Sequence, residues 1–199
     1  MTYGVQDMKD RAIALMHEML QESRETENIP SIGIALMYCA ELFKLYNDKD
    51  KVRVYAQELC DICDKYNLPI YKGYGQMQLD WSNESIVHEQ ETYDVLYNEG
   101  SFFSFAHYQS FYAETYASQG QLEKAIVKLN RCIEIDQGIP HLYYMANLKY
   151  TKAKCLLQLG PEKQQEASSL LEEALELAKS QGAIYYVRLI ENEILNNKR

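Results

Sequence analysis

The fold is decided by two stretches that repeat one pattern, YASQGQLEKAIVKLNRCIEI (residues 116–135) and CLLQLGPEKQQEASSLLEEALELA (residues 155–178). In each stretch an apolar helical pattern runs up to a Gly, and a charged turn follows. An Ala-x-x-x-Leu-x-x-small stripe then starts the next helical pattern, since residues four apart share one face of a helix. Each stretch therefore predicts a pair of helices joined by a short turn.

Six positions of one pair align with six positions of the other. They are Ala113, Tyr116, Gly120, Ala125, Leu129 and Cys132 in the first pair, and Ala153, Leu156, Gly160, Ala167, Leu171 and Ala174 in the second. The small residues allow two helices to approach closely, and the Gly ends the first helix. The second pair has two extra residues between Gly160 and Ala167. Weaker copies of the second-helix stripe occur at Ala56, Cys60 and Cys63, and at Ala12, Met16 and Met19.

The whole chain follows the same helical spacing. Apolar residues recur at intervals of three and four, without a sustained alternating run of strand composition. Pro30, Pro69, Pro140 and Pro161 lie where helices would begin, and Gly100 and Gly182 lie where they would end. The sequence thus predicts an all-α fold of about ten helices, at 3–25, 31–47, 50–66, 69–82, 84–98, 102–118, 122–136, 140–159, 163–180 and 183–197.

The repeated hairpin resembles the tetratricopeptide repeat (TPR). The order of patterns from residue 7 to 197 is similar to the TPR-like arrays at the C-terminal end of bacterial signalling ATPases, including cyclase-linked ATPases and transcription activators. YNEGSFFSFAHYQSFYAETYASQGQLEKA (97–125), LPIYKGYGQMQLDW (68–81) and AKSQGAIYYVRLI (178–190) carry this likeness. The resemblance implies one domain over residues 1–199, a right-handed superhelix of antiparallel helix pairs. Because the chain starts within a repeat, we expect a fragment or end of a larger protein with an upstream domain.

The composition excludes several classes of partner. A net charge of −9 from acids spread along the chain argues against nucleic acid and against an anionic membrane. The N-terminus lacks the pattern of a signal peptide, and the longest apolar stretch, residues 32–43, is short and contains Glu41. Five cysteines, an odd number, lie within helical patterns. A reducing, cytoplasmic setting suits them best.

Chemistry at a metal or cofactor finds little support. Cys60 and Cys63 form a C-x-x-C pair, but both lie in the middle of a predicted helix at packing positions, so we expect buried side chains. Redox or metal chemistry at this pair is the alternative. The four histidines are scattered, and the sequence has no phosphate-binding loop and no nucleophile motif. We therefore expect no enzymatic activity, no cofactor and no metal.

The repeat register places six residues on the inner surface of the superhelix as a candidate binding groove. They are His107, Ser110 and Glu114 on the 102–118 helix, and Asn147, Tyr150 and Lys154 on the 140–159 helix. We expect these side chains to be exposed, with Tyr150 as an aromatic anchor for a peptide. An ordinary solvated face is the alternative. Glu114 would repel a peptide carboxylate, which argues against a carboxylate clamp.

These patterns favour a protein- or peptide-binding scaffold or regulatory module of a signalling protein. One alternative is a sensor that encloses a short signalling peptide or small ligand in the groove. Another is self-association, because residues 8–20 carry an apolar stripe with no preceding helix to cover it. That stripe predicts a homodimer or a contact with an upstream domain.

Overall fold

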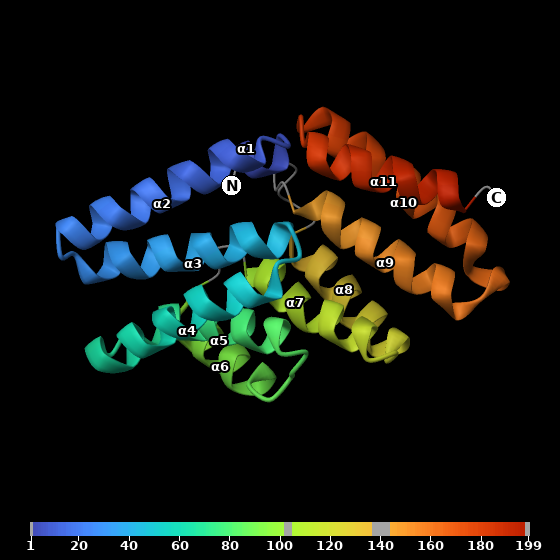
Figure 1. Ribbon diagram of the computed structural model, residues 1–199. Helices are drawn as coiled ribbons and strands as arrows, with labels where there is room; N and C mark the ends of the chain where they lie inside the picture. Colours follow the sequence, from blue (N-terminus) through green and yellow to red (C-terminus); the bar gives the residue numbers. More distant parts are fainter. Residues whose placement is uncertain (1, 102–104, 137–143, 198–199) are drawn as a thin grey trace. The chain divides into compact units, whose positions relative to one another are not determined.

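The computed structural model describes residues 2–101, 105–136 and 144–197 (Figure 1). The first helices are α1 (Thr2–Val5), α2 (Lys9–Glu25), α3 (Ile29–Leu45), α4 (Lys49–Tyr66), α5 (Pro69–Ser82) and α6 (Glu89–Asn98). The later elements are α7 (Phe105–Ser118), α8 (Leu122–Asp136), α9 (Met145–Leu159), the 3-10 turn η1 (Pro161–Lys163), α10 (Gln164–Ser180) and α11 (Ile184–Asn196). Within these ranges all regular structure is helical, which confirms the predicted all-α class.

The chain forms two compact units, and each is described by itself. The first contains residues 1–4 and 8–108, and the second contains residues 5–7 and 109–199, so that α7 begins in one unit and ends in the other. In the first unit each helix from α2 to α6 packs on the next, and α3 also contacts α5. In the second unit α8 to α11 pack in the same order, and α9 also contacts α11. Such packing of successive neighbours is that of a helical repeat array.

The same turn joins helix to helix along the chain. It places one residue in the left-handed conformation directly or shortly after a helix: Glu27, Asn47, Asn67, Glu84, Gly100, Gly120 and Gly182. In six of these seven turns the next N–H donates back to the carbonyl five residues earlier, as from Asp48 to Phe43 at 2.9 Å and from Ser101 to Leu96 at 2.9 Å. This bond is the Schellman pattern that closes a helix C-terminus. The predicted helix ends at Gly100 and Gly182 are confirmed.

The aligned repeat positions form the core of these hairpins. Ala113, Ala125, Ala153, Ala167 and Ala174 are fully buried. The large or sulfur-containing partners Leu129, Cys132, Leu156 and Leu171 are also buried, whereas Tyr116 is half-buried. The weaker copy at Ala56, Cys60 and Cys63 is buried as well. The pattern that predicted the repeat is therefore a packing pattern.

Two glycines in α5 set the spacing of its neighbours. A Cβ atom on Gly75 would lie 2.8 Å from Cys60 Sγ and 3.2 Å from Leu59, so α4 and α5 are closer here than any larger residue permits. A Cβ atom on Gly73 would meet Leu96 of α6 at 3.5 Å, which is an ordinary contact. Only Gly75 is thus required by packing.

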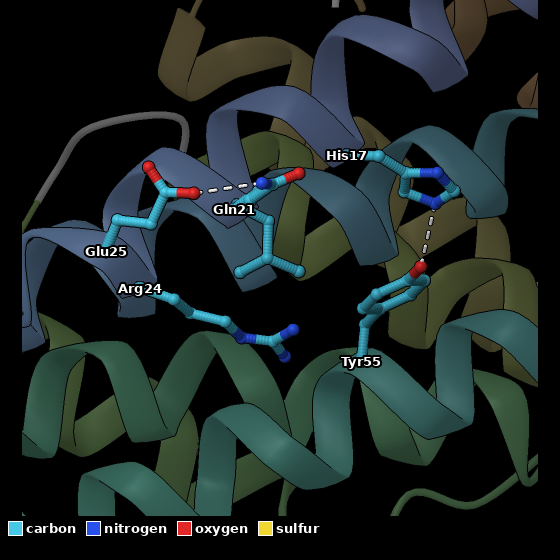
Figure 2. A pocket seen from close by; sticks show the side chains of 6 residues that line it. His17, Gln21, Arg24, Glu25 and Tyr55 are labelled. Atoms are coloured by element: carbon cyan, nitrogen blue, oxygen red, sulfur yellow. Dashed lines mark hydrogen bonds between the residues drawn. The ribbon is translucent and has the colours of Figure 1, made fainter.

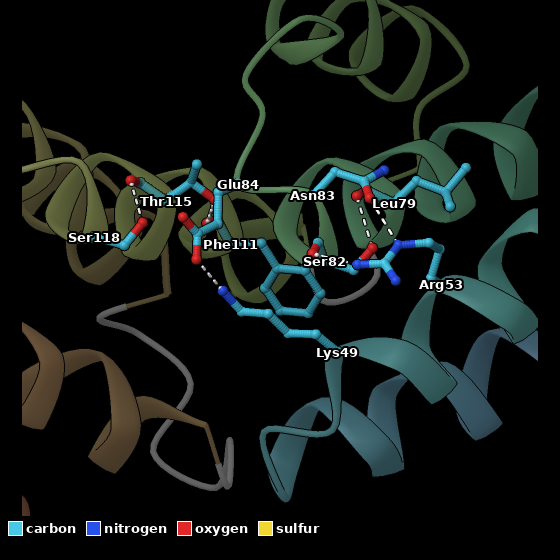
Figure 3. Close-up of polar contacts among 9 residues, drawn as sticks. All are labelled: Lys49, Arg53, Leu79, Ser82, Asn83, Glu84, Phe111, Thr115 and Ser118. Carbon is cyan, nitrogen blue, oxygen red and sulfur yellow. Dashed lines mark hydrogen bonds and ion pairs between the residues drawn. The ribbon is translucent and has the colours of Figure 1, made fainter.

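Polar contacts join the start of α4 to the end of α5 (Figure 3). Arg53 donates to Asn83 Oδ1 at 2.8 Å and to the carbonyl oxygen of Ser82 at 3.1 Å, and Lys49 pairs with Glu84. These contacts fix the turn that follows α5. Asn28 and Asp48 cap α3 and α4 by accepting the backbone N–H of the residue three positions on.

Two predicted helix starts are wrong. The helix predicted at 3–25 is interrupted at Asp7, which has a φ of 62°, and α2 begins at Lys9. The helix predicted at 84–98 begins at Glu89, because the buried carboxylate of Asp80 holds the preceding loop. That carboxylate accepts the backbone N–H of His88 at 2.9 Å and lies 3.0 Å from His88 Nδ1.

The starts predicted at residues 102 and 140, including Pro140, lie outside the described residues. Pro30, Pro69 and Pro161 do begin helical elements, as predicted. Within the described ranges, none of the helices combines the length and the apolar character that crossing a bilayer requires.

Candidate functional site

On α7, none of the three predicted groove residues is exposed. His107 and Ser110 are buried, and Glu114 is half-buried. The expectation of an exposed face is wrong here because α7 is covered on every side from Phe105 to Ala113. The repeat register assumed one solvated face for this helix, and its sequence, rich in aromatic and small residues, leaves none in that segment.

His107 belongs instead to a buried polar cluster in the first unit. Its Nε2 lies 3.1 Å from Oε1 of Glu41, a residue of α3 that is 3% exposed. The Tyr108 hydroxyl donates to the other carboxylate oxygen at 2.9 Å. Glu41 also contributes, after burial, to raising the pKa of Tyr38. The buried carboxylate of Glu41 therefore links the first turn of α7 to α3 by hydrogen bonds.

On α9, the three predicted residues share one face, but only one of them is exposed. Lys154 is exposed, Asn147 is half-buried, and Tyr150 is only 7% exposed. The Tyr150 hydroxyl donates to Glu193 of α11 at 3.4 Å, and Lys154 Nζ lies 5.6 Å from the centre of the Tyr150 ring. Burial, and then Glu193, raise the pKa of Tyr150. The expectation of Tyr150 as an exposed anchor is wrong, because its ring packs between α9 and α11.

A different surface of the first unit is open to solvent and chemically varied. Helices α2 and α4 leave a hollow of about 540 Å³ between them (Figure 2). Its lining consists of His17, Leu20, Gln21, Arg24, Glu25 and Tyr55. We call this the α2–α4 hollow.

Side-chain contacts bridge the two helices at both ends of the α2–α4 hollow. His17 Nε2 lies 3.0 Å from the Tyr55 hydroxyl, and Arg24 Nη2 donates to Glu58 Oε1 at 2.5 Å. His17 and Arg24 lie two turns apart on α2, or about 10 Å at 1.5 Å per residue. Between them, Gln21 Nε2 donates to Glu25 Oε1 at 2.9 Å. These contacts on the rim are exposed, and each is therefore of modest strength.

The floor of the hollow is apolar and its aromatic wall is supported from below. Leu20 is buried beneath the rim. The Tyr55 ring stacks on Phe43 of α3, with ring centroids 5.6 Å apart and an interplanar angle of 2°. Burial raises the pKa of Tyr55, and its protonated hydroxyl can both donate and accept a hydrogen bond. The hollow thus offers an apolar floor, one ring and both donors and acceptors.

The second unit has a hollow of about 570 Å³ with less varied chemistry. Its lining consists of Lys152 of α9 and Glu162, Gln165, Glu166, Ser169, Leu170 and Glu173 of η1 and α10. Glu173 pairs with Lys149 at 2.6 Å, and Glu166 pairs with Lys163 at 3.3 Å. No aromatic ring lines this hollow, and most of its lining side chains are charged groups or amides, so we prefer the α2–α4 hollow as the candidate site.

The cysteines are packing residues, as predicted for Cys60 and Cys63. All five are buried and free of disulfides. Burial raises the pKa of Cys39 and Cys60 to about 12 and that of Cys63 and Cys155 to about 11. Such thiols react slowly because the thiolate is the nucleophile. In the described part of the chain, no three His, Cys, Asp or Glu side chains are grouped so as to hold a metal ion.

The apolar stripe predicted at residues 8–20 is only partly open. Ala12 and Leu20 are buried, Met16 and Met19 are half-buried, and Leu15 is 39% exposed. The helix also supplies the rim of the α2–α4 hollow, which sequence reasoning missed. The available signal was the polar row His17, Gln21 and Arg24, spaced by four and three on a face beside the apolar stripe.

Comparison with known proteins adds no assignment. The sequence matches no protein-family model, and a search of the curated proteins finds no significant match.

Proposed function

We propose that this chain is a protein- or peptide-binding module, a TPR-like helical array without catalytic activity of its own. The observation that carries the proposal is the α2–α4 hollow. Its Tyr55 ring already stacks on Phe43 of α3, so that this ring would need little further ordering when a partner binds. Preorganisation of this kind favours affinity.

The form of the hollow favours a macromolecular partner over a small ligand. Sites for small molecules are mostly apolar and bury most of the ligand surface. The α2–α4 hollow is open, and Leu20 is its single aliphatic lining residue. An open hollow of mixed polarity instead suits a few side chains of a larger partner. The rest of that partner would contact the helices around the hollow. The alternative of an enclosing sensor has no comparable support.

The setting of the module follows from the resemblance and the cysteines. The likeness to arrays of bacterial signalling ATPases supports a regulatory role within a larger signalling protein. Five buried thiols without a disulfide would suit a reducing, cytoplasmic compartment. Self-association through residues 8–20 stays a prediction.

Selection of random peptides displayed on phage tests the proposal. We expect the immobilised chain to enrich peptides with a shared motif, with affinities in the micromolar range. The variant Gln21→Trp, which places an indole in the α2–α4 hollow, should lose at least about tenfold in affinity for these peptides. A tenfold loss corresponds to about 1.4 kcal/mol, which is typical of a blocked contact in an interface.

Gln158→Trp is the matched control, because Gln158 is an exposed glutamine near the end of α9 in the other unit. It should bind the selected peptides as the natural chain does. Failure to enrich any motif, or equal binding by both tryptophan variants, would count against the proposed function at this site.

A further inference from the structure

Helix α6 in the first unit has one packed side and one side that faces solvent. Thr92 and Leu96 are buried. Glu91, Asp94 and Tyr97 are exposed, and their spacing of three residues places them along another face of the same helix. Val87, just before α6, and Glu99, just after it, are exposed too. We call Val87, Glu91, Asp94, Tyr97 and Glu99 the α6 face.

Aromatic and apolar groups make this face more than a solvated surface. Tyr97 is 55% exposed and Val87 is 80% exposed. The Tyr97 ring stacks on Tyr93, with centroids 5.9 Å apart and an interplanar angle of 9°, and Tyr93 in turn meets Phe105 edge-on at 5.4 Å. The exposed Tyr97 ring therefore stacks on a tyrosine that is itself packed against Phe105. A rigid tyrosine face can bind a cation through its π-system.

The charge of the chain is concentrated in the unit that carries this face. Residues 1–4 and 8–108 hold seventeen Asp and Glu against nine Lys and Arg, a net charge of −8. The second unit holds twelve against eleven, a net charge of −1. Between Lys72 and Lys124 the sequence contains no Lys or Arg at all. The α6 face lies in the middle of this base-free stretch.

The carboxylates of the α6 face are not neutralised within the described part of the chain. There, Glu91, Asp94 and Glu99 take part in no ion pair, and Asp94 accepts only the neutral amide of Gln90, at 2.8 Å. Lys72 feels the charge of Glu91, but its ammonium is bound by Asp64 at 2.5 Å. The face therefore presents uncompensated negative charge around an exposed aromatic ring.

We propose that the α6 face docks a basic segment of a protein partner, with Arg or Lys side chains on Glu91, Asp94 and Glu99 and one of them over the Tyr97 ring. Charge complementarity selects this partner, because an acidic protein, a nucleic acid or an anionic membrane would be repelled. Arginine suits the face best, since its planar guanidinium can both stack on a ring and bind a carboxylate in two places. The inference adds a partner chemistry to the binding role proposed above, at a surface separate from the α2–α4 hollow.

Fluorescence anisotropy with a defined probe tests the docking site. The probe is a fluorescein-labelled peptide of six Gly-Arg repeats, and a peptide of six Gly-Glu repeats is the negative control, both in about 50 mM salt, where surface charges are weakly screened. We expect the Gly-Arg peptide to bind saturably and the Gly-Glu peptide not to bind. The triple variant Glu91→Gln, Asp94→Asn, Glu99→Gln should weaken it at least about fivefold, and Tyr97→Leu should weaken it about two- to fivefold.

A charge-matched triple separates local docking from general attraction. The control variant Glu18→Gln, Glu172→Gln, Glu176→Gln removes three exposed carboxylates of α2 and α10 that also form no ion pair in the described chain. It should change the affinity less than about twofold. Equal losses in the two triple variants, no loss in either, or no saturable binding of the Gly-Arg peptide would each overturn the proposal.

The same probe keeps this inference distinct from the proposed function. Gln21→Trp blocks the α2–α4 hollow and should leave binding of the Gly-Arg peptide unchanged. Suppose that Gln21→Trp leaves the affinity for the selected peptides unchanged while the α6 triple variant still weakens binding of the Gly-Arg peptide. Only the assignment of the α2–α4 hollow would then be wrong. If Gln21→Trp weakens binding of the selected peptides and the α6 triple variant binds the Gly-Arg peptide as before, only the α6 docking site would be wrong.

Discussion

At the scale of residues, the buried Glu41 links helix α3 to the first turn of α7. It accepts the Tyr108 hydroxyl at 2.9 Å and lies 3.1 Å from His107, while itself only 3% exposed. Removing one partner of a buried polar contact leaves the others desolvated without their bond, and this costs more than the bond contributes.

We therefore expect Glu41→Ala to lower the free energy of unfolding by about 3 kcal/mol. Glu41→Gln keeps an acceptor for Tyr108 and should cost about half as much. Urea denaturation followed by circular dichroism measures both, with the exposed Glu22→Ala as a control that should stay within about 0.5 kcal/mol. If both Glu41 variants lowered the free energy of unfolding by less than this limit, the contacts of Glu41 with α7 would not stabilise the fold.

Sequence reasoning works well for residues with local roles and poorly for those with distant partners. Ala125 and Leu129 were identified by spacing alone, because both lie on the buried stripe of a single helix. Glu41 and His107 are 66 residues apart, and no local pattern indicates their contact. The repeat register therefore predicted an exposed His107, because it gave no indication of the contact with Glu41.

At the scale of elements, α5 shows how a helix in the array is held at close range on two sides. A Cβ atom on Gly75 would overlap Cys60 of α4, whereas one on Gly73 would fit against Leu96 of α6. Both glycines are buried and helical, so intrinsic helix propensity acts on them alike. They differ only in the space available.

We expect Gly75→Ala to lower the free energy of unfolding by about 1–3 kcal/mol through overpacking. Gly73→Ala should be neutral or stabilising by up to about 1 kcal/mol, because alanine favours a helix over glycine. Adding Cys60→Ala to Gly75→Ala should recover part of the loss, and a double-mutant cycle by urea denaturation gives the coupling. Identical effects of the two single substitutions would contradict the close contact of α4 with α5.

Element boundaries were predictable where the turn residue is glycine and less so elsewhere. Gly100 and Gly182 marked helix ends correctly, since glycine adopts the left-handed conformation without strain. Asp7 and Glu84 adopt it as well, with φ of 62° and 53°, and their identity gives no such signal. For this reason the sequence did not predict the interruption of the 3–25 helix at Asp7. It also placed a helix start at Glu84, whereas α6 begins at Glu89.

At the scale of the whole molecule, the two units share one construction and differ in charge and surface chemistry. Each stacks successive helices and contains one contact between next-but-one helices, α3 with α5 and α9 with α11. The first unit holds nearly all of the net negative charge, the α2–α4 hollow and the α6 face. We therefore expect the first unit to carry the partner-binding surfaces, and the second to bind neither class of peptide used above.

The candidate site could not be predicted at this scale because it is made by helices that are not neighbours in the chain. His17 and Tyr55 are 38 residues apart, with all of α3 between them. The repeat register predicts which faces pack, as it did for the alanine stripes. It does not predict how far apart two next-but-one helices stand, and that distance creates the hollow.

The most direct test of the central claim is to map a selected peptide onto the isotopically labelled chain by amide chemical shifts in nuclear magnetic resonance. We expect saturable shifts concentrated in α2 around His17 to Glu25 and in α4 around Tyr55 and Glu58, and the loss of these shifts in Gln21→Trp. Shifts confined to α8–α11, or none that saturate, would contradict the claim that the array binds its partner through the α2–α4 hollow.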